Sequence, residues 1–437
     1  MATSQPLFLF DWQASPPGVR SPELAATWAS LEVQVDDDPI SVIRDVGTGV
    51  IQKTITVPLY SLAEWISFNW WLLLLNGRVD SGHRGVERRG MHPHRSWSNS
   101  LRGAGDGFLW PDLTIAAVGD LTRLEWHRDG FDQRDREIRY VSSGTKLVDT
   151  AWIASSLAEM VEAVLVRLSE AGIKKTPLHD EWDSLRTLDV DEQEFCAACG
   201  RLGIDPFSEG QDLAEAIANA FENVDPGIRN EFLDAADPYL LDKGVAWTRE
   251  ALSAARAVPA PRGTVPVAEL RSGLHAIAHG NGNTRPYVVG YEQARRVRSA
   301  LNLSADSPFP DEVPVGVEEY DSPDPALQGL TVATTDRSAA GLIIGWKASD
   351  TGRRFARTRA FWHLLFGRLD APFLLSEGGS RDQQMARAFA AELLCPAEGI
   401  RTLLPGRGGL LARLPVIADR FGVSELVVEH QIENQLT

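Results

Sequence analysis

The residues of this chain that could do chemistry gather near its C-terminal end, between Arg353 and Pro396. This stretch begins R-R-F-A-R-T-R-A-F-W-H-L-L-F and, after a gap, continues R-D-Q-Q-M-A-R-A-F-A-A-E-L-L-C-P. Both segments have the apolar spacing of helices that pack along one face. The first segment carries one histidine, His363, and the second carries an aspartate near its start, Asp382. Two such helices have the layout of a helical zinc site.

A helical zinc site of the peptidase type needs a defined set of groups. In the pattern H-E-x-x-H, the two histidines lie four residues apart on one helix face and bind the metal. The glutamate beside the first histidine activates a water molecule, and a third ligand comes from the next helix. The stretch between Arg353 and Pro396 contains both helices and His363, but it does not contain the complete pattern.

Four motifs in the C-terminal part of the chain, taken in order, resemble the ImmA/IrrE family of bacterial metallopeptidase-like proteins. They are G-Y-E-Q-A-R-R-V-R-S-A-L-N-L, R-R-F-A-R-T-R-A-F-W-H-L-L, A-R-A-F-A-A-E-L-L-C-P and R-F-G-V-S-E-L-V-V-E-H-Q-I-E-N. The resemblance covers roughly residues 286–434. It implies a mainly helical, zincin-like domain with a small sheet.

The family's helix reads F-x-x-A-H-E-x-G-H, and the resemblance implies how its positions correspond to this chain. With Phe355 on the phenylalanine, His363 stands at the second histidine. Arg359 then replaces the first histidine, and Ala360 replaces the glutamate. Two of the three chemical positions on this helix have therefore changed.

The same correspondence places Gln383 at the third metal ligand, which is usually a glutamate, with Asp382 beside it. Arg359 cannot bind a cation because its guanidinium is charged and has no free lone pair. Ala360 cannot act as a general base, and Gln383 is a poor zinc ligand. The weak metal candidates that remain are His363 and Asp382, which do not complete a zinc site. We therefore expect no cofactor, with zinc as the alternative.

These substitutions predict a non-catalytic protein that acts by binding a protein or peptide, with Arg359, His363 and Asp382 in the former cleft. The resemblance places such proteins in bacterial stress regulation, mobile elements or phage defence. The alternative hypothesis is an active zinc endopeptidase with relocated ligands that cleaves a regulatory partner. Its candidate ligands are His275, His279, His363 and Asp382.

The stretch H-A-I-A-H-G-N-G-N-T-R, from His275 to Arg285, is similar to the nucleotidyl-transfer motif of Fic proteins. In that motif a histidine accepts a proton and a G-N-G loop holds phosphate. The acidic metal-binding position is His279 here, and the arginine position is Asn283. Without the carboxylate there is no obvious magnesium site. A Gly/Asn-rich loop is the favoured interpretation. A third hypothesis is a different activity, in this Fic-like loop or in the β-rich N-terminal region.

Histidines and cysteines elsewhere have simpler interpretations. His92 and His94, with His83 nearby, lie in a polar stretch that is typical of an exposed loop. Cys196 and Cys199 form a C-x-x-C inside helical sequence, and a zinc site would need a second ligand pair. We expect the two cysteines to be small core residues.

The chain ends with a segment that resembles a helix-turn-helix, in which F-G-V-S separates two short helices within residues 416–434. On the second helix, Glu425, Glu429 and Glu433 would face the phosphates of a bound DNA. Such a surface disfavours DNA binding, so we expect a packing role and regard a DNA-binding regulator as the residual hypothesis.

The strands and helices that the sequence predicts around these groups indicate an α+β fold. Residues 1–145 form a β-rich domain, because apolar and polar residues alternate over 31–35, 51–57 and the pair 113–118 and 121–127. A Trp-rich helix in this domain, expected to begin with a capping box at Ser61 and Glu64, should be buried under the strands.

The remaining divisions follow from composition. Residues 146–256 are predicted to be helical, and A-V-P-A-P-R-G-T-V-P over 257–266 is typical of a linker. Residues 267–437 form the ImmA/IrrE-like, degenerate metallopeptidase domain.

The composition of this 437-residue chain limits its cellular compartment and its classes of partner. A formal net charge of −17 argues against non-specific binding to nucleic acid or anionic membranes. Three cysteines suggest a reducing compartment. The longest apolar run, Trp70 to Leu75, is too short to span a bilayer. We expect a cytoplasmic protein with no membrane partner, and the sequence leaves the oligomeric state open.

Overall fold

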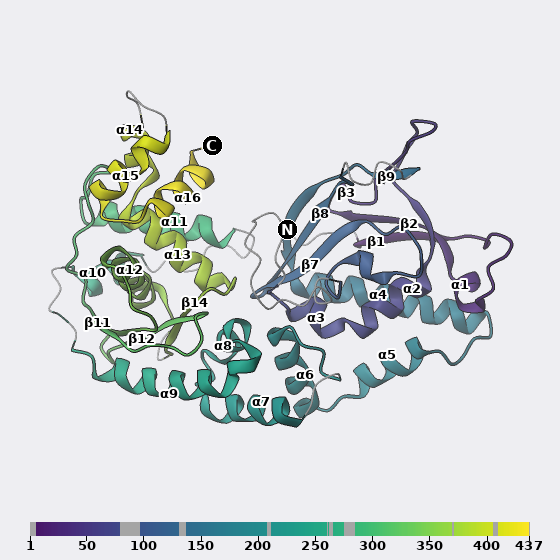
Figure 1. Cartoon of the computed structure of the whole chain (residues 1–437), viewed down its shortest axis with the longest axis horizontal. Helices are drawn as coiled ribbons and strands as arrows, with labels where there is room; N and C mark the ends of the chain where they lie inside the picture. The colour runs from purple at the N-terminus through teal and green to yellow at the C-terminus, as the bar shows by residue number, and fades with distance from the viewer. Residues whose placement is uncertain are drawn as a thin grey trace. The chain divides into compact units, whose positions relative to one another are not determined.

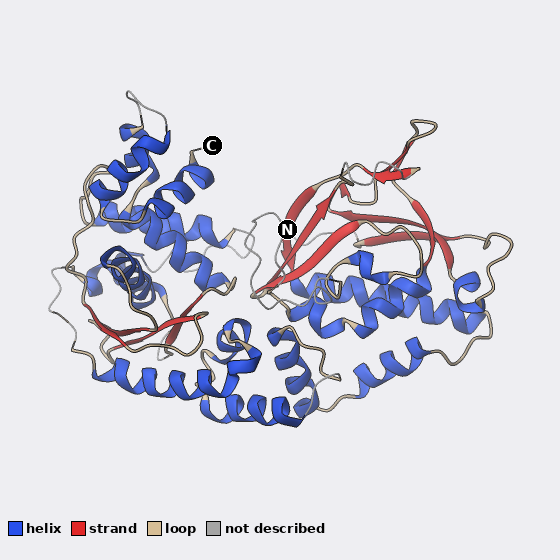
Figure 2. Cartoon of the chain, viewed as in Figure 1, coloured by secondary structure: helices blue, strands red, loops and turns tan. Residues whose placement is uncertain are grey.

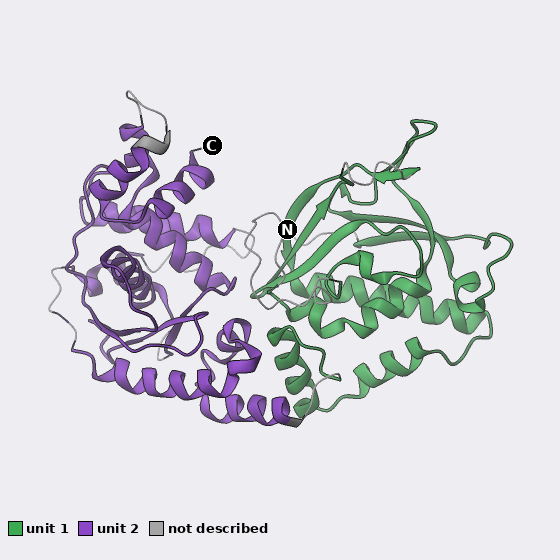
Figure 3. Ribbon diagram, viewed as in Figure 1, with its two compact units in different colours: residues 1–210 green, residues 211–437 purple. Residues whose placement is uncertain are grey.

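The computed structural model describes residues 6–78, 97–130, 137–207, 211–259, 261, 265–274, 285–368, 371–404 and 410–436. Contacts within the chain divide it into two compact units, Met1–Gly210 and Gln211–Thr437 (Figure 3). Sheets lie in the N-terminal part, helices in the middle, and a helical region with a small sheet at the C-terminal end (Figure 2). The predicted α+β class is therefore confirmed. The helical stretch predicted over 146–256 contributes helices to both units.

The first unit combines short antiparallel sheets with helices (Figure 1). Its strands are β1 (Phe8–Trp12), β2 (Trp28–Val35), β3 (Asp38–Pro39), β4 (Ile43–Asp45), β5 (Ile51–Gln52), β6 (Ile55–Pro58), β7 (Asp112–Val118), β8 (Leu121–His127), β9 (Ile138–Tyr140) and β10 (Gly144–Asp149). Its helices are α1 (Pro22–Ala26), α2 (Leu59–Phe68), α3 (Trp70–Leu75), the 3-10 helix η2 (Leu101–Ala104), α4 (Thr150–Glu170), α5 (Pro177–Thr187) and α6 (Val190–Leu202). Strand β2 lies between β1 and β6, and β8 lies between β7 and β10.

The β7–β8 hairpin shows how the alternating pattern produces a strand pair. Val118 pairs with Leu121 across a turn formed by Gly119 and Asp120. Gly119 has φ 67°, a conformation that glycine adopts without the steric penalty of a side chain. Leu113 and Leu124 are buried on the core side of the two strands. The strands predicted over 113–118 and 121–127 are confirmed.

The Trp-rich helix is present but begins and ends differently from the prediction. Helix α2 begins at Leu59 with Pro58 as its N-cap, and no side chain caps it. Ser61 is buried inside the first turn, and its hydroxyl has no hydrogen-bond partner in the part of the chain that the structure describes. The predicted capping box was wrong because Pro58, at the end of β6, starts the helix before Ser61. Asn69 then separates α2 from α3, with its amide bonded to the Trp65 carbonyl at 2.8 Å.

The second unit is mainly helical around one sheet (Figure 1). Its elements are α7 (Gln211–Asn223), α8 (Arg229–Ala235), the 3-10 helix η4 (Pro238–Leu240), α9 (Leu241–Ala257), α10 (Val267–Leu274), α11 (Pro286–Ala300), β11 (Val315–Glu319), β12 (Leu327–Ala333), β13 (Ala340–Ile344), α12 (Asp350–Phe366), β14 (Phe373–Ser376), α13 (Arg381–Leu394), α14 (Ala397–Leu403), α15 (Leu410–Phe421) and α16 (Glu425–Gln435). The strand order is β11-β13-β12-β14, with β11 parallel to β13 and the other pairs antiparallel.

The sheet of the second unit is covered by helices on both faces. Leu342 and Ile344 of β13 belong to the core that α12 shares. Gly341, the residue before Leu342, faces the opposite helix α9, where an added Cβ would lie 2.0 Å from the Ala255 carbonyl oxygen. Alternate residues of a strand point to opposite faces, so a glycine here lets α9 approach the sheet closely.

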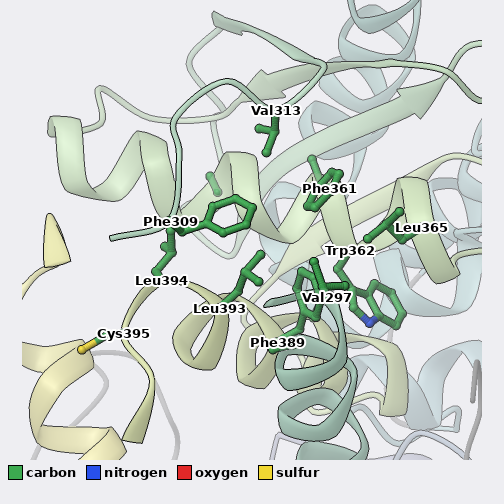
Figure 4. Packing of buried hydrophobic residues seen from close by; sticks show 14 of the residues in the cluster. Val297, Phe309, Val313, Phe361, Trp362, Leu365, Phe389, Leu393, Leu394 and Cys395 are labelled. Carbon is green, nitrogen blue, oxygen red and sulfur yellow. The ribbon is translucent and has the colours of Figure 1, made fainter. Parts of the chain in front are cut away.

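Helices α11, α12 and α13 enclose the hydrophobic core of the second unit (Figure 4). Phe361 and Trp362 from α12 and Phe389 from α13 are all buried in it. Helix α11 approaches α13 at Gly290, where a Cβ would lie 2.4 Å from the Met385 carbonyl oxygen. Three of the motifs that carry the family resemblance therefore supply this core.

Three smaller predictions concern the helices. Cys196 and Cys199 are buried inside α6, as predicted for core residues. The predicted linker at 257–266 begins at Ala257, the last residue of α9, and residues 260 and 262–264 lie outside the described residues. Among the described residues, no helix is both long enough and apolar enough to span a lipid bilayer.

Candidate functional site

Arg359, at the position that the resemblance assigns to the first zinc-binding histidine, lies inside the second unit. It is 3% exposed on α12. Its guanidinium donates to the Gln328 Oε1 atom at 2.9 Å and to the Ser376 carbonyl oxygen at 3.1 Å. It also donates to the Gln383 Oε1 atom. Arg359 therefore connects α12 to β12, β14 and α13.

Gln383, at the position assigned to the third ligand, is fully buried in the first turn of α13. Ser380 caps this helix. The Gln383 side chain donates to the Leu374 carbonyl oxygen and accepts a hydrogen bond from the Ser376 backbone N–H at 3.3 Å. Its oxygen also accepts from Arg359. Two positions that would share a metal under the correspondence therefore share a hydrogen bond.

Two further charged residues complete the cluster around Arg359. Glu231 of α8 accepts a hydrogen bond from the Ser376 hydroxyl at 2.6 Å. Arg387, one helical turn after Gln383, donates to the Ser376 carbonyl oxygen at 3.2 Å and to the Gly378 carbonyl oxygen at 2.7 Å. We call Arg359, Arg387, Glu231, Gln383 and Ser376 the arginine cluster.

Burial sets the electrostatics of the arginine cluster. Burial, together with the charge of Arg387, lowers the pKa of Arg359 to about 9, while the charge of Glu231 opposes the shift. Burial also raises the pKa of Glu231, against hydrogen bonds from Ser376 and Ser380. Desolvation disfavours the charged form of each group. Even so, Arg359 stays protonated at neutral pH and has no lone pair for a metal.

His363 is the one histidine of the predicted zinc pattern that the chain retains, and it is 2% exposed. Its Nε2 atom donates to the Ala371 carbonyl oxygen at 3.1 Å, because a carbonyl can only accept. Its ring stacks on Phe373 at 5.1 Å with an interplanar angle of 8°. Burial, with the charge of Arg337, lowers its pKa to about 4.

The second ring nitrogen of His363 is also enclosed. A Cβ added at Gly367 would lie 2.0 Å from Nδ1, so the end of α12 packs directly against this atom. Both nitrogens of the neutral imidazole therefore face protein atoms. His363 has the surroundings of a satisfied core histidine.

The other predicted site residues are not gathered around His363. Ala360 is fully buried in the core, and Asp382 is partly exposed in the first turn of α13. Within the described ranges, no three His, Cys, Asp or Glu side chains are placed to hold a metal ion together. His275 and His279, with the Fic-like loop, lie outside the described residues. The same holds for His83, His92 and His94.

Sequence analysis did not identify Glu231 or Arg387 as members of the cluster. The position of Arg387, four residues after Gln383, was a usable signal because such residues share a helix face. Glu231 carried no comparable signal, because it precedes α12 by more than a hundred residues.

A search against models of protein families finds no match to this chain, and a search of curated proteins finds none either. The resemblance to the ImmA/IrrE family therefore rests on the four motifs quoted above.

Proposed function

We propose that this chain is a non-catalytic, ImmA/IrrE-like protein that acts by binding a protein or peptide partner in the bacterial cytoplasm. The observation that supports this proposal is the hydrogen bond between Arg359 and Gln383. Under the correspondence, these residues stand at two metal-ligand positions. A protonated guanidinium there repels a cation and cannot ligate it.

The other groups that hydrolysis would need are also missing from this helix. Ala360, at the position of the general base, has no side chain that can take a proton. His363 donates Nε2–H to Ala371, so this nitrogen cannot bind a metal without losing a buried hydrogen bond. The proposed role is therefore binding in the settings that the resemblance implies: stress regulation, mobile elements or phage defence.

Burial also decides which residues could meet a partner. Arg359 and His363 were expected to line a cleft, but they are 3% and 2% exposed. In our proposal these two side chains hold α12 in place, and the partner contacts exposed residues. Asp382, which is partly exposed, remains a candidate for such contact.

The test is a metal analysis of the full chain. The protein is incubated with zinc, desalted and measured by plasma mass spectrometry. We expect zinc far below one ion per chain. Stoichiometric zinc that disappears in His363→Ala would overturn the proposal and support the active peptidase.

A second variant tests the correspondence itself. The triple variant Arg359→His, Ala360→Glu and Gln383→Glu restores the family's pattern around His363. If the correspondence is correct, this variant gains about one zinc ion per folded chain. Arg357→His adds a histidine to the same helix outside the pattern and is the matched control. A folded triple variant that gains no more zinc than this control would contradict the resemblance.

A further inference from the structure

A small cavity lies in the first unit where the break between α2 and α3 meets α5 and the residues after α6. Its lining includes Phe68, Trp71, Glu181, Asp205 and Phe207. Its volume is about 10 Å³. A space of this size holds one group the size of a water molecule. We call it the α2–α5 cavity.

Two aromatic side chains flank this cavity and remain open to solvent. Phe68, the last residue of α2, is 51% exposed, and Phe207 is 64% exposed. Phe207 is held in place by a hydrogen bond from its backbone N–H to the Asp205 carboxylate at 3.0 Å. A single exposed phenylalanine needs no explanation, but two that border one cavity form a local apolar surface.

Glu181 brings a carboxylate to the same cavity. It is partly buried on α5 and makes no hydrogen bond or ion pair with the described part of the chain. Burial is the main cause that raises its pKa, and the charge of Asp205 adds to it. A nearby cation stabilises the charged form of a carboxylate in such surroundings.

We propose that the α2–α5 cavity binds the ammonium group of a lysine side chain from a partner protein. Glu181 and Asp205 supply the negative charge beside the aromatic side chains that line the cavity. The cavity has room for an ammonium group but not for the larger planar guanidinium of arginine. Phe68 and Phe207 can cover the apolar stem of the lysine side chain.

This cavity belongs to the first unit, so the proposal does not depend on the resemblance of the second unit to metallopeptidases. It names a chemical feature of the partner: an exposed lysine with few acidic neighbours. The net charge of −17 favours the approach of such a basic surface.

The test uses the full chain and the peptide acetyl-Gly-Lys-Gly-amide in isothermal titration calorimetry at low salt. We expect a Kd on the order of 1 mM, since one side chain makes the contact. A peptide with norleucine in place of lysine, or with arginine, should bind at least about tenfold more weakly.

Variants then locate the binding. Glu181→Gln should raise the Kd of the lysine peptide about tenfold, and Phe207→Ala should raise it about fivefold. Asp183→Asn is the matched control, because Asp183 is an exposed carboxylate on the same helix, and it should leave the Kd unchanged. Circular dichroism shows whether each variant remains folded.

Two outcomes would overturn the proposal. The first is a norleucine peptide that binds as tightly as the lysine peptide, which would mean that only apolar contact matters. The second is an equal loss of affinity in Asp183→Asn and Glu181→Gln, which would mean that general charge attracts the peptide.

Discussion

The two ends of helix α13 hold buried polar groups in very different ways. Near its C-terminal end, Glu392 is 2% exposed. It accepts hydrogen bonds from Arg295 Nε at 2.9 Å, from Gln431 and Gln435 Nε2 at 2.8 Å each, and from the Ala397 N–H at 3.2 Å. This carboxylate has donors from α11, α14 and α16, so it joins four helices.

The N-terminal half of α13 contributes Gln383 and Arg387 to the arginine cluster. Here the guanidinium groups of Arg359 and Arg387 share the carboxylate of Glu231, and Glu377 adds a second carboxylate near Arg387. Burial lowers the pKa of both arginines and raises the pKa of Glu231, so the surroundings disfavour every charge in the cluster.

At one end of α13, a buried carboxylate has a full set of hydrogen-bond donors. At the other end, burial disfavours the charges of the arginine cluster. Glu392 lies in the A-A-E-L-L-C-P motif, and its hydrogen bonds are complete. Arg359 stands at a position that differs from the family's pattern, and its guanidinium donates to neutral oxygens of Gln328, Ser376 and Gln383. Under the correspondence, its charge lies where the family would hold a metal cation, so we suggest that the guanidinium replaces the charge of the metal.

The largest expected effect comes from Glu392→Gln. The new amide group would point N–H donors at the donors of Gln431 and Ala397, and Arg295 would lose its charged partner. We expect the free energy of unfolding to fall by about 3–4 kcal/mol. Urea denaturation followed by circular dichroism measures it.

Glu398→Gln is the control for this prediction, because Glu398 forms an exposed ion pair with Arg401 on α14. Exposed pairs contribute about 0–1 kcal/mol. If both variants lost the same small amount of stability, Glu392 would not be the joint that its hydrogen bonds describe.

Local patterns in the sequence predicted much of the fold. The alternation in β7 and β8 and the helix around Cys196 and Cys199 were confirmed, because burial on one face imposes a period that the residues must follow. The start of α2 was missed, because Ser61 carries a capping pattern while the chain turns into the helix at Pro58. The capping pattern favoured a helix that begins at Ser61. Strand β6 ends at Pro58, however, and the helix follows it directly.

Part of the candidate site could also be predicted from the sequence, and part could not. The correspondence paired Arg359 with Gln383, and the structure brings them into contact. It could not predict that Glu231 of α8 would face Arg359 and Arg387, because contacts between distant segments leave no trace in one sequence. The carbonyl of Ala371, which binds His363, was equally unpredictable, since any residue in that place would offer a carbonyl oxygen.

The next effect concerns His363 and the pH. Its pKa is about 4 in the folded chain and 6.5 as the ordinary value, so the unfolded chain binds a proton first as the pH falls. Stability is therefore fully present above pH 6.5 and falls until about pH 4. A shift of this size corresponds to about 3 kcal/mol. Urea denaturation at several pH values measures it.

His363→Phe should remove this pH dependence while it keeps a ring against Phe373. His430→Gln, on α16, changes a histidine outside the core and should leave the dependence intact. A wild-type chain that is equally stable at pH 4.5 and pH 7 would show that His363 is not enclosed as described.

The smallest of the three effects is expected for Glu231→Gln. The neutral amide keeps an oxygen that can accept the Ser376 hydroxyl, and the raised pKa of Glu231 shows that its surroundings already tolerate the uncharged form. The loss is the attraction to Arg359 and Arg387, which we place at about 1–2 kcal/mol of unfolding free energy. Glu222→Gln, an exposed change on α7, is the control and should alter stability by less than about 0.5 kcal/mol.

The comparison between the ends of α13 depends on how much unfolding free energy Glu231→Gln loses relative to Glu392→Gln. If Glu231→Gln destabilised the chain as much as Glu392→Gln, the arginine cluster would be a structural joint like the one at Glu392. If it costs much less, the attraction between Glu231 and the two arginines contributes little to the fold. Its arginines would then be explained better by the replacement of a former metal ion than by a need for stability.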